Sequence, residues 1–169
     1  MVIIHVKDFG DMSFELDYEN APISAANFVA LARAGFYDGL TFHRIIKGFM
    51  IQGGNGLLKG KRLNYTIKGE FRSNNVNNNL LHDRGVLSMA RTPDPNSATS
   101  QFFVMHKKAP HLDGDYAAFG RMISGEETLD KIASVRTDRW NGDAPYEPVI
   151  ISSVEVIDEP VKDYPKLFR

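Results

Sequence analysis

The chain has 169 residues, enough for one domain that buries about two-thirds of its surface without covalent cross-links. Its 43% hydrophobic and 24% charged residues are typical of a globular protein, and the net charge of −1 gives no reason to expect nucleic acid as a partner. The absence of cysteine excludes disulfides, thiolate metal sites and a cysteine nucleophile. Because no apolar run resembles a signal peptide or a membrane span, we expect a cytoplasmic protein without membrane association.

The first 35 residues predict a hairpin followed by a helix. Apolar residues alternate over residues 2–8 and again over 12–16, which is the period of two half-buried strands. Residues 20–35 are rich in alanine, with Pro22 placed for a first helical turn and Gly35 for a C-terminal stop. We expect this helix to pack against the end of a barrel.

Residues 42–54, Phe-His-Arg-Ile-Ile-Lys-Gly-Phe-Met-Ile-Gln-Gly-Gly, are the most informative stretch. Aromatic and β-branched residues on both sides of a Lys-Gly pair predict a strand, a kink and a second strand. Arg44 and Gln52 are long polar side chains within these apolar runs. An arginine that reaches solvent along the barrel wall is the simpler interpretation. Two polar heads with Phe49 and Met50 between them favour the wall of a mostly apolar pocket.

The second half of the chain is expected to supply the remaining strands and a second helix. Short apolar runs predict strands at residues 85–91, 101–106, 117–123 and 149–157. The Ser-Gly-Glu-Glu sequence at residues 124–127 is typical of a capping box that opens a helix ending near residue 135.

These elements predict a mostly β protein. About eight strands and two separate helices favour a closed eight-stranded antiparallel β-barrel capped by two α-helices over an α/β sheet, in which strands and helices would alternate. We expect one domain over residues 1–169, with residues 158–169 as a surface tail.

Several motifs in order carry a family resemblance. Besides residues 42–54, these are Leu87-Ser-Met-Ala-Arg91, Ser100-Gln-Phe-Phe103 and Leu112-Asp-Gly114, followed by Phe119-Gly120. Together they resemble the cyclophilin family of peptidyl-prolyl cis–trans isomerases, and the Ser-Met-Ala-Arg-Thr-Pro-Asp-Pro sequence is similar to small bacterial-type, single-domain members. The resemblance extends over nearly the whole chain. It implies an eight-stranded barrel with a groove on its outer face and isomerisation of X-Pro bonds in peptides and in unfolded or folding proteins, without a covalent intermediate, cofactor or metal.

The resemblance also implies roles for individual residues. The family's catalytic arginine falls on Arg44, with further catalytic contacts at Gln52 and Phe49. The remaining substrate-binding positions are Met50, Ala90, Arg91, Gln101, Phe103, His111, Leu112 and Tyr116.

Three of these positions depart from the familiar eukaryotic pattern. Arg91 replaces a usual asparagine, Tyr116 a usual groove histidine, and His111 a tryptophan that helps to hold cyclosporin. We therefore expect an altered peptide preference and weak cyclosporin binding. The chain is expected to be a monomer.

Other functions remain open at this point. The same groove could serve a non-catalytic module or chaperone that holds proline-containing segments without turnover. The five histidines lack the tight spacing of a metal site, so we expect no metal. Ser88 and Ser100 lack a nucleophile elbow, which argues against acyl transfer.

Overall fold

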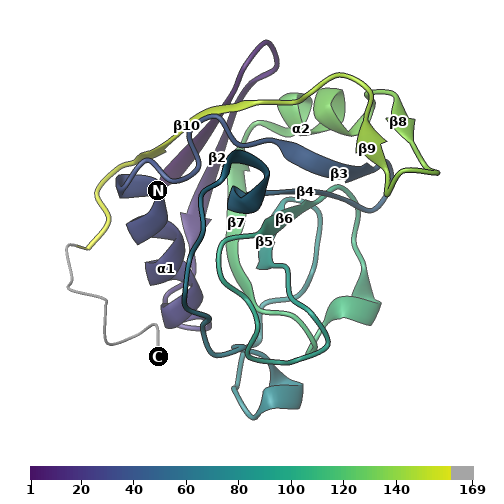
Figure 1. Ribbon diagram of the computed structural model, residues 1–169. Coiled ribbons are helices and arrows are strands. Elements are labelled where there is room, and N and C mark those ends of the chain that lie inside the picture. The colour runs from purple at the N-terminus through teal and green to yellow at the C-terminus, as the bar shows by residue number, and fades with distance from the viewer. Residues whose placement is uncertain (161–169) are drawn as a thin grey trace.

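The computed structural model describes residues 1–160, and the rest of the expected C-terminal tail, residues 161–169, lies outside them. Eight strands form one antiparallel sheet: β1 (Val2–Val6), β2 (Gly10–Leu16), β3 (Phe42–Ile46), β4 (Met50–Gly53), β5 (Val86–Met89), β6 (Phe102–Met105), β7 (Ala118–Ser124) and β10 (Ile151–Val156). Their order in the sheet is β10-β1-β2-β7-β5-β6-β4-β3 (Figure 1). The prediction of a mostly β protein with eight antiparallel strands is confirmed.

The sheet curls into an open barrel and not into the fully closed one that the sequence predicts. The residues just before its edge strands β3 and β10 meet at an isolated bridge between Thr41 and Ile150, beside a hydrogen bond from the Phe42 N–H to the Val149 carbonyl at 3.0 Å. Farther along β3, the N–H of Ile45 donates instead to the carbonyl of Asp143. Because β3 pairs here with a different segment, no continuous ladder joins the two edges.

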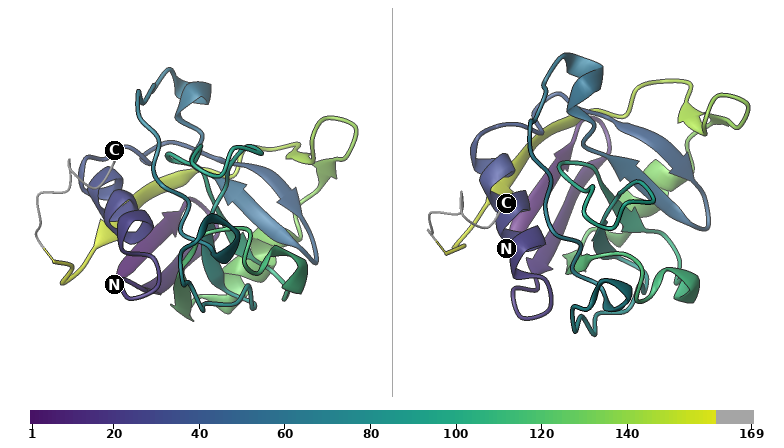
Figure 2. Two further views of the ribbon diagram at one scale, coloured as in Figure 1. Left: turned by 90° about the horizontal axis from the view of Figure 1, so that it is seen from below. Right: turned by 60° about the horizontal axis from the view of Figure 1, so that its bottom comes forward.

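Two helices pack on the sheet at opposite ends, as Figures 1 and 2 show. Helix α1 (Pro22–Arg33) lies against β10 and β7, and α2 (Glu126–Ala133) lies beside β2, β3 and β4. Pro22 opens α1 as expected, and Gly35, with a φ of +71°, follows its end. Within residues 1–160, neither helix has the length and apolar character that crossing a bilayer requires.

The predicted capping box is wrong. Ser124 is the last residue of β7 and pairs with Ser13, so it stays in the ladder. The residue before α2 is Gly125, and no side chain caps the helix. Gly125 has a φ of +109°, and a Cβ there would come within 2.6 Å of the Asp11 carbonyl oxygen. The tight approach to β2 therefore requires glycine at the position where the chain turns into α2.

Several short elements escaped prediction because they are too short to show a periodic pattern. They are a small hairpin, β8 (Thr137–Asp138) with β9 (Ala144–Pro145), and the 3₁₀ turns η1 (Gly56–Lys59), η2 (Arg72–Asn74) and η3 (Pro110–Leu112).

The beginning of the expected surface tail is packed against the domain. Glu159 is buried, and the hydroxyl of Tyr18 donates to its carboxylate at 2.5 Å. Arg33 donates to the Glu159 carbonyl at 3.0 Å. Residues 158–160 are thus tied to α1 and the loop before it, and they do not form a free tail.

Both faces of the central strands are covered by hydrophobic clusters. In β6, Phe102 and Val104 point into the main core, whereas Phe103 and Met105 point to a second cluster on the outer face. This arrangement explains why β6 is a continuous apolar run without polar alternation. The outer cluster consists of Met50, Val86, Phe103, Met105, Ala109, Leu112 and Ala118.

Candidate functional site

A β-bulge in β3 sets the direction of Arg44. Phe42 pairs with Gly53 and Arg44 pairs with Gln52, so His43 is an extra residue in the ladder. Strict alternation would place residues 42 and 44 on the same face. The bulge reverses the phase, as bulges beside functional sites commonly do. Phe42 is therefore buried in the main core, while Arg44 lies on the outer face.

Arg44 begins a row of polar side chains on that face. Its Nη1 donates to Oε1 of Gln52 at 3.3 Å, and Nε2 of Gln52 donates to Oε1 of Gln101 at 3.1 Å. The row fixes which way both amides face. Among residues 1–160 no carboxylate lies within ion-pair distance of the Arg44 guanidinium, so its other donors stay available.

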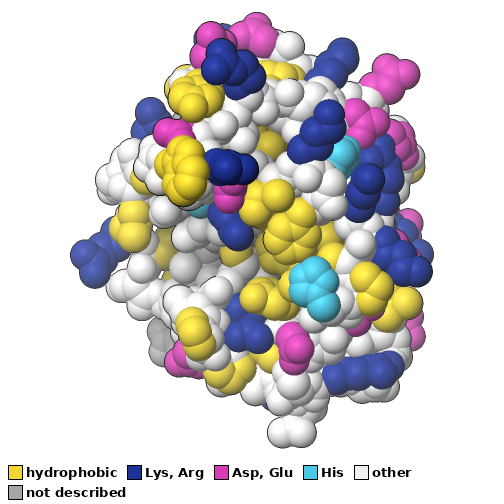
Figure 3. Space-filling model, turned by 90° about the vertical axis from the view of Figure 1, so that its right-hand side faces the viewer, with side chains coloured by type: hydrophobic (Ala, Val, Ile, Leu, Met, Phe, Trp, Pro, Cys, Tyr) yellow, Lys and Arg dark blue, Asp and Glu magenta, His cyan; other side chains and the backbone are white. Residues whose placement is uncertain are grey.

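The polar row borders a cavity of ≈ 150 Å³ on the outer sheet face. It is lined by Arg44, Phe49, Met50, Gln52, Ala90, Arg91, Phe103, Leu112 and Tyr116. Figure 3, viewed from the side of the β3–β4 hairpin, shows hydrophobic side chains gathered around a hollow with basic groups at its border. The cavity lining thus combines apolar side chains with two arginines, Arg44 and Arg91.

The other two predicted contact residues lie beside this cavity. Gln101 lines an adjoining hollow, also of ≈ 150 Å³, which shares Gln52, Ala90 and Arg91 with the first. His111 is exposed and stacks on Phe49 with 5.8 Å between ring centroids, so it forms the rim. A larger hollow of ≈ 450 Å³ near the β1–β2 turn contains none of the predicted residues.

A buried histidine that sequence reasoning missed supports the cavity floor. The His82 ring stacks on Phe103 with centroids 6.1 Å apart. Its Nδ1 donates to the Asp113 carboxylate at 3.0 Å, and its Nε2 accepts from the Ser88 hydroxyl at 2.8 Å. Burial lowers the pKa of His82, and Asp113 partly opposes this, so the imidazole is neutral. An isolated histidine in an asparagine-rich loop carries no pattern that would have revealed this role.

Arg91 lines the cavity, and its guanidinium already binds carbonyl groups and aromatic rings of the protein. The guanidinium lies 4.7 Å from the ring centroids of both Phe71 and Tyr116. Its Nε and Nη2 donate to the Asp115 carbonyl at 2.9 and 2.6 Å, and Nη1 donates to the Thr92 carbonyl at 2.9 Å. Most of its five N–H groups are therefore used within the protein. The structure brings Arg91 to the cavity as predicted, as a rigid side wall.

The same arrangement of motifs is found in known proteins. A family model described as "Cyclophilin type peptidyl-prolyl cis-trans isomerase/CLD" matches residues 1–156. The chain belongs to the cyclophilin family. The predicted resemblance is therefore confirmed.

Relatives of this cyclophilin agree in sequence and fold. It is 40% identical to peptidyl-prolyl cis-trans isomerase A of Dickeya dadantii, over 88% of this chain and 80% of that protein. It is also 40% identical to a peptidyl-prolyl cis-trans isomerase of Arabidopsis thaliana, over 95% of this chain and 98% of that protein. A Cryptosporidium parvum cyclophilin, crystallised in the presence of the dipeptide Ala-Pro, matches with a TM-score of 0.82 and 34% identity, over 94% of this chain and 99% of that one.

Some relatives are much longer. The chain is 42% identical to peptidyl-prolyl cis-trans isomerase-like 2 of Cryptococcus neoformans, but it spans only 27% of the length of that protein.

Proposed function

We propose that this cyclophilin is a peptidyl-prolyl cis–trans isomerase that accelerates rotation about X-Pro bonds in peptides and in unfolded or folding proteins. The observation that carries the proposal is the position of Arg44: a guanidinium without an ion-pair partner among residues 1–160, at the edge of an apolar cavity with Phe103 on its floor. Neither a cofactor nor a covalent intermediate is needed for this reaction.

Catalysis of this rotation requires stabilisation of the twisted imide bond. Resonance gives the imide C–N bond partial double-bond character and a rotation barrier of about 18–20 kcal/mol. In the half-rotated state the lone pair returns to the prolyl nitrogen, where it can accept a hydrogen bond. The apolar cavity would hold the proline ring while the preceding carbonyl swings, and the Arg44 guanidinium would donate to that nitrogen. Such an interaction favours the transition state over both planar states.

Arg44 cannot supply the whole acceleration. A millionfold rate increase corresponds to about 8 kcal/mol, whereas a hydrogen bond to a charged group contributes roughly 1.5–3 kcal/mol net in folding measurements. The remainder has to come from the cavity and from contacts to the substrate backbone. Gln52 and Gln101 present amides of fixed orientation along the path an extended peptide would follow. These contacts hold the residues beside proline while the bond rotates.

The same site supports a class of ligand. The Ala-Pro dipeptide named for the Cryptosporidium parvum cyclophilin supports small X-Pro segments as ligands here. His111 at the rim offers a smaller and more polar surface than tryptophan, so we propose weak cyclosporin binding. A monomeric state and a cytoplasmic location remain predictions.

A protease-coupled isomerisation assay on an Ala-Pro peptide tests the proposal. Wild-type protein should turn over rapidly. Arg44→Ala should lose about a hundredfold or more in kcat/KM, comparable to removal of an oxyanion-hole donor, while peptide binding measured by titration is largely kept. Arg121→Ala is the matched control, because Arg121 is an exposed arginine in β7 that pairs weakly with Asp17 at 3.9 Å. Equal turnover by wild type and Arg44→Ala would refute the role of Arg44, and peptide binding without turnover by wild type would indicate a non-catalytic binding module.

A further inference from the structure

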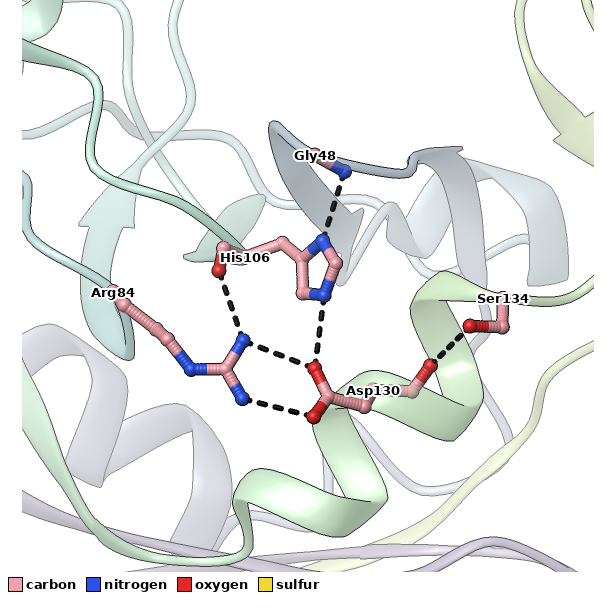
Figure 4. Close-up of polar contacts among 5 residues, drawn as sticks. All are labelled: Gly48, Arg84, His106, Asp130 and Ser134. Carbon is pink, nitrogen blue, oxygen red and sulfur yellow. Dashed lines mark hydrogen bonds and ion pairs between the residues drawn. The ribbon is translucent and has the colours of Figure 1, made fainter.

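The apex of the β3–β4 hairpin is tied to the end of β6 by an imidazole. The Phe49 N–H donates to the Ile46 carbonyl at 2.9 Å, and Gly48 has a φ of +82°, as at the third position of a type II turn. The N–H of Gly48 then points away from the hairpin. It donates to Nδ1 of His106 at 2.8 Å (Figure 4).

The Gly48 contact determines the tautomer of His106. A backbone N–H can only donate, so Nδ1 must accept and the ring proton must be on Nε2. Nε2 lies 2.9 Å from Oδ1 of Asp130 in α2, the carboxylate that receives this proton as a hydrogen bond. With 9% of its side chain exposed, His106 is a nearly buried ring with both nitrogens bonded.

Arg84 holds Asp130 in place for this contact. Its Nη1 and Nη2 bind the two carboxylate oxygens at 3.0 and 3.1 Å, and Nη1 also donates to the His106 carbonyl at 3.1 Å. Arg84, and then His106, lower the pKa of Asp130. Figure 4 shows the chain of contacts running from α2 through the imidazole to the hairpin.

The tip of the hairpin apex lies at the surface. Lys47 and Gly48 are exposed, and a Cβ placed on Gly48 would meet no atom within 4 Å. The next residue is Phe49, whose ring lines the cavity and whose carbonyl accepts from the His106 N–H at 2.9 Å. His106 therefore binds the backbone on both sides of the Gly48–Phe49 peptide, through its imidazole on one side and its own N–H on the other. A shift of this turn would move Phe49, and with it one wall of the cavity.

We propose that His106 is a positioning residue for the proline cavity: through the Gly48 N–H it fixes Phe49, and Asp130 and Arg84 hold the imidazole in the tautomer that this requires. The proposal rests on the proposed function only in that the cavity receives proline. A purely structural role, in which His106 does no more than attach α2 to the sheet, predicts a different outcome when its two hydrogen bonds are removed separately.

Three variants separate these hydrogen bonds. His106→Asn keeps an acceptor near the Nδ1 position but is too short to reach Asp130. His106→Gln can donate to Asp130 from the Nε2 position but offers no acceptor where Nδ1 stood. His106→Ala removes both. His5→Ala is the matched control, because both nitrogens of His5 also bind carboxylates, of Asp11 and Glu155, and the strands that carry these three residues, β1, β2 and β10, contribute nothing to the cavity lining.

The measurements are the dissociation constant of an Ala-Pro peptide, kcat/KM, the melting temperature and hydrogen exchange at the Gly48 amide. We expect His106→Ala and His106→Gln to weaken peptide binding and kcat/KM by about tenfold, less than the roughly hundredfold cost of a full 1 Å misplacement. Gly48 exchange should accelerate in both. His106→Asn should stay within about twofold of wild type in binding and keep Gly48 protected, even if its melting temperature falls as far as that of His106→Gln. His5→Ala should change stability alone.

The proposal is overturned if peptide affinity follows the melting temperature and does not depend on a side-chain acceptor for the Gly48 N–H. In that case His106→Asn and His106→Gln would be equally impaired, or equally normal, in peptide binding. If wild-type protein binds the peptide but does not isomerise it, the proposed function fails, and the affinities still decide the role of His106.

Discussion

Arg44 and Gln52 face each other across the β3–β4 ladder, and the guanidinium donates to the amide oxygen at 3.3 Å. Because the Gln52 amide is uncharged, the contact orients the guanidinium without neutralising its charge. Gln52 in turn is held by Gln101. An ionised carboxylate at the same position would compete directly with the substrate for the guanidinium.

Substitution of Gln52 by glutamate should therefore harm catalysis more than truncation. A carboxylate beside Arg44 would form a charge-assisted hydrogen bond worth roughly 1.5–3 kcal/mol. We expect kcat/KM of Gln52→Glu to fall at least about tenfold below that of Gln52→Ala at pH 7, as measured in the protease-coupled assay. Recovery of the Gln52→Glu variant at acid pH, where the carboxylate is protonated, would support this cause. A Gln52→Glu variant as active as Gln52→Ala would contradict it.

Two neighbouring phenylalanines in β6 lie on opposite faces of the sheet. Phe102 is buried in the main core and Phe103 in the outer cluster at the cavity. Both Phe→Leu substitutions should lower the free energy of unfolding by about 1–3 kcal/mol, measured by urea denaturation. Phe103→Leu should also weaken binding of an Ala-Pro peptide several-fold, whereas Phe102→Leu should not. Similar losses of affinity in both variants would show that Phe103 acts through stability alone.

His82 should make stability depend on pH below neutrality. Burial lowers its pKa in the folded protein from an ordinary value of 6.5. As pH falls through 6.5, the unfolded chain takes up a proton that the folded protein excludes, so the free energy of unfolding decreases. The difference in unfolding free energy between wild type and His82→Gln should be largest near pH 7.5 and shrink toward pH 5, as followed by urea denaturation. The raised pKa of His5 is common to both proteins and cancels. A difference that stays constant over this range would show that His82 is not held neutral by the fold.

Much of the fold could be predicted because long periodic segments and a few turn residues carry it. Alternation revealed the first hairpin, and Pro22 and Gly35 bracketed α1. The N-terminus of α1, however, is capped by a residue far along the chain. The Glu70 carboxylate accepts from the Ile23 and Ser24 N–H groups at 3.1 and 2.6 Å, and local pattern rules cannot find such a partner. The same limit applies to Ser124. Its sequence resembles a capping box, but the chain turns into α2 at Gly125, in tight contact with β2.

Motifs and the family that they resemble were enough to name residues that line one cavity, but not to give the geometry of that cavity. Alternation alone gives no sign of the bulge at His43 that turns Arg44 outward. Nor does it indicate that the Arg91 guanidinium lies against two aromatic rings, that the His82 ring stacks on Phe103, or that His106 accepts a hydrogen bond from the hairpin apex. Each of these depends on pairing between strands or loops that lie far apart in the sequence.

The central claim, that a rigid guanidinium lowers the barrier to rotation, is tested most directly by the rate of cis–trans exchange on the enzyme. This rate can be measured by NMR exchange spectroscopy on an Ala-Pro peptide at saturating protein, for wild type and Arg44→Lys. Lysine keeps the positive charge but loses the planar array of donors. We expect the exchange rate on Arg44→Lys to fall more than about tenfold while the dissociation constant of the peptide changes by less than about threefold. An exchange rate equal to that of wild type would contradict the account.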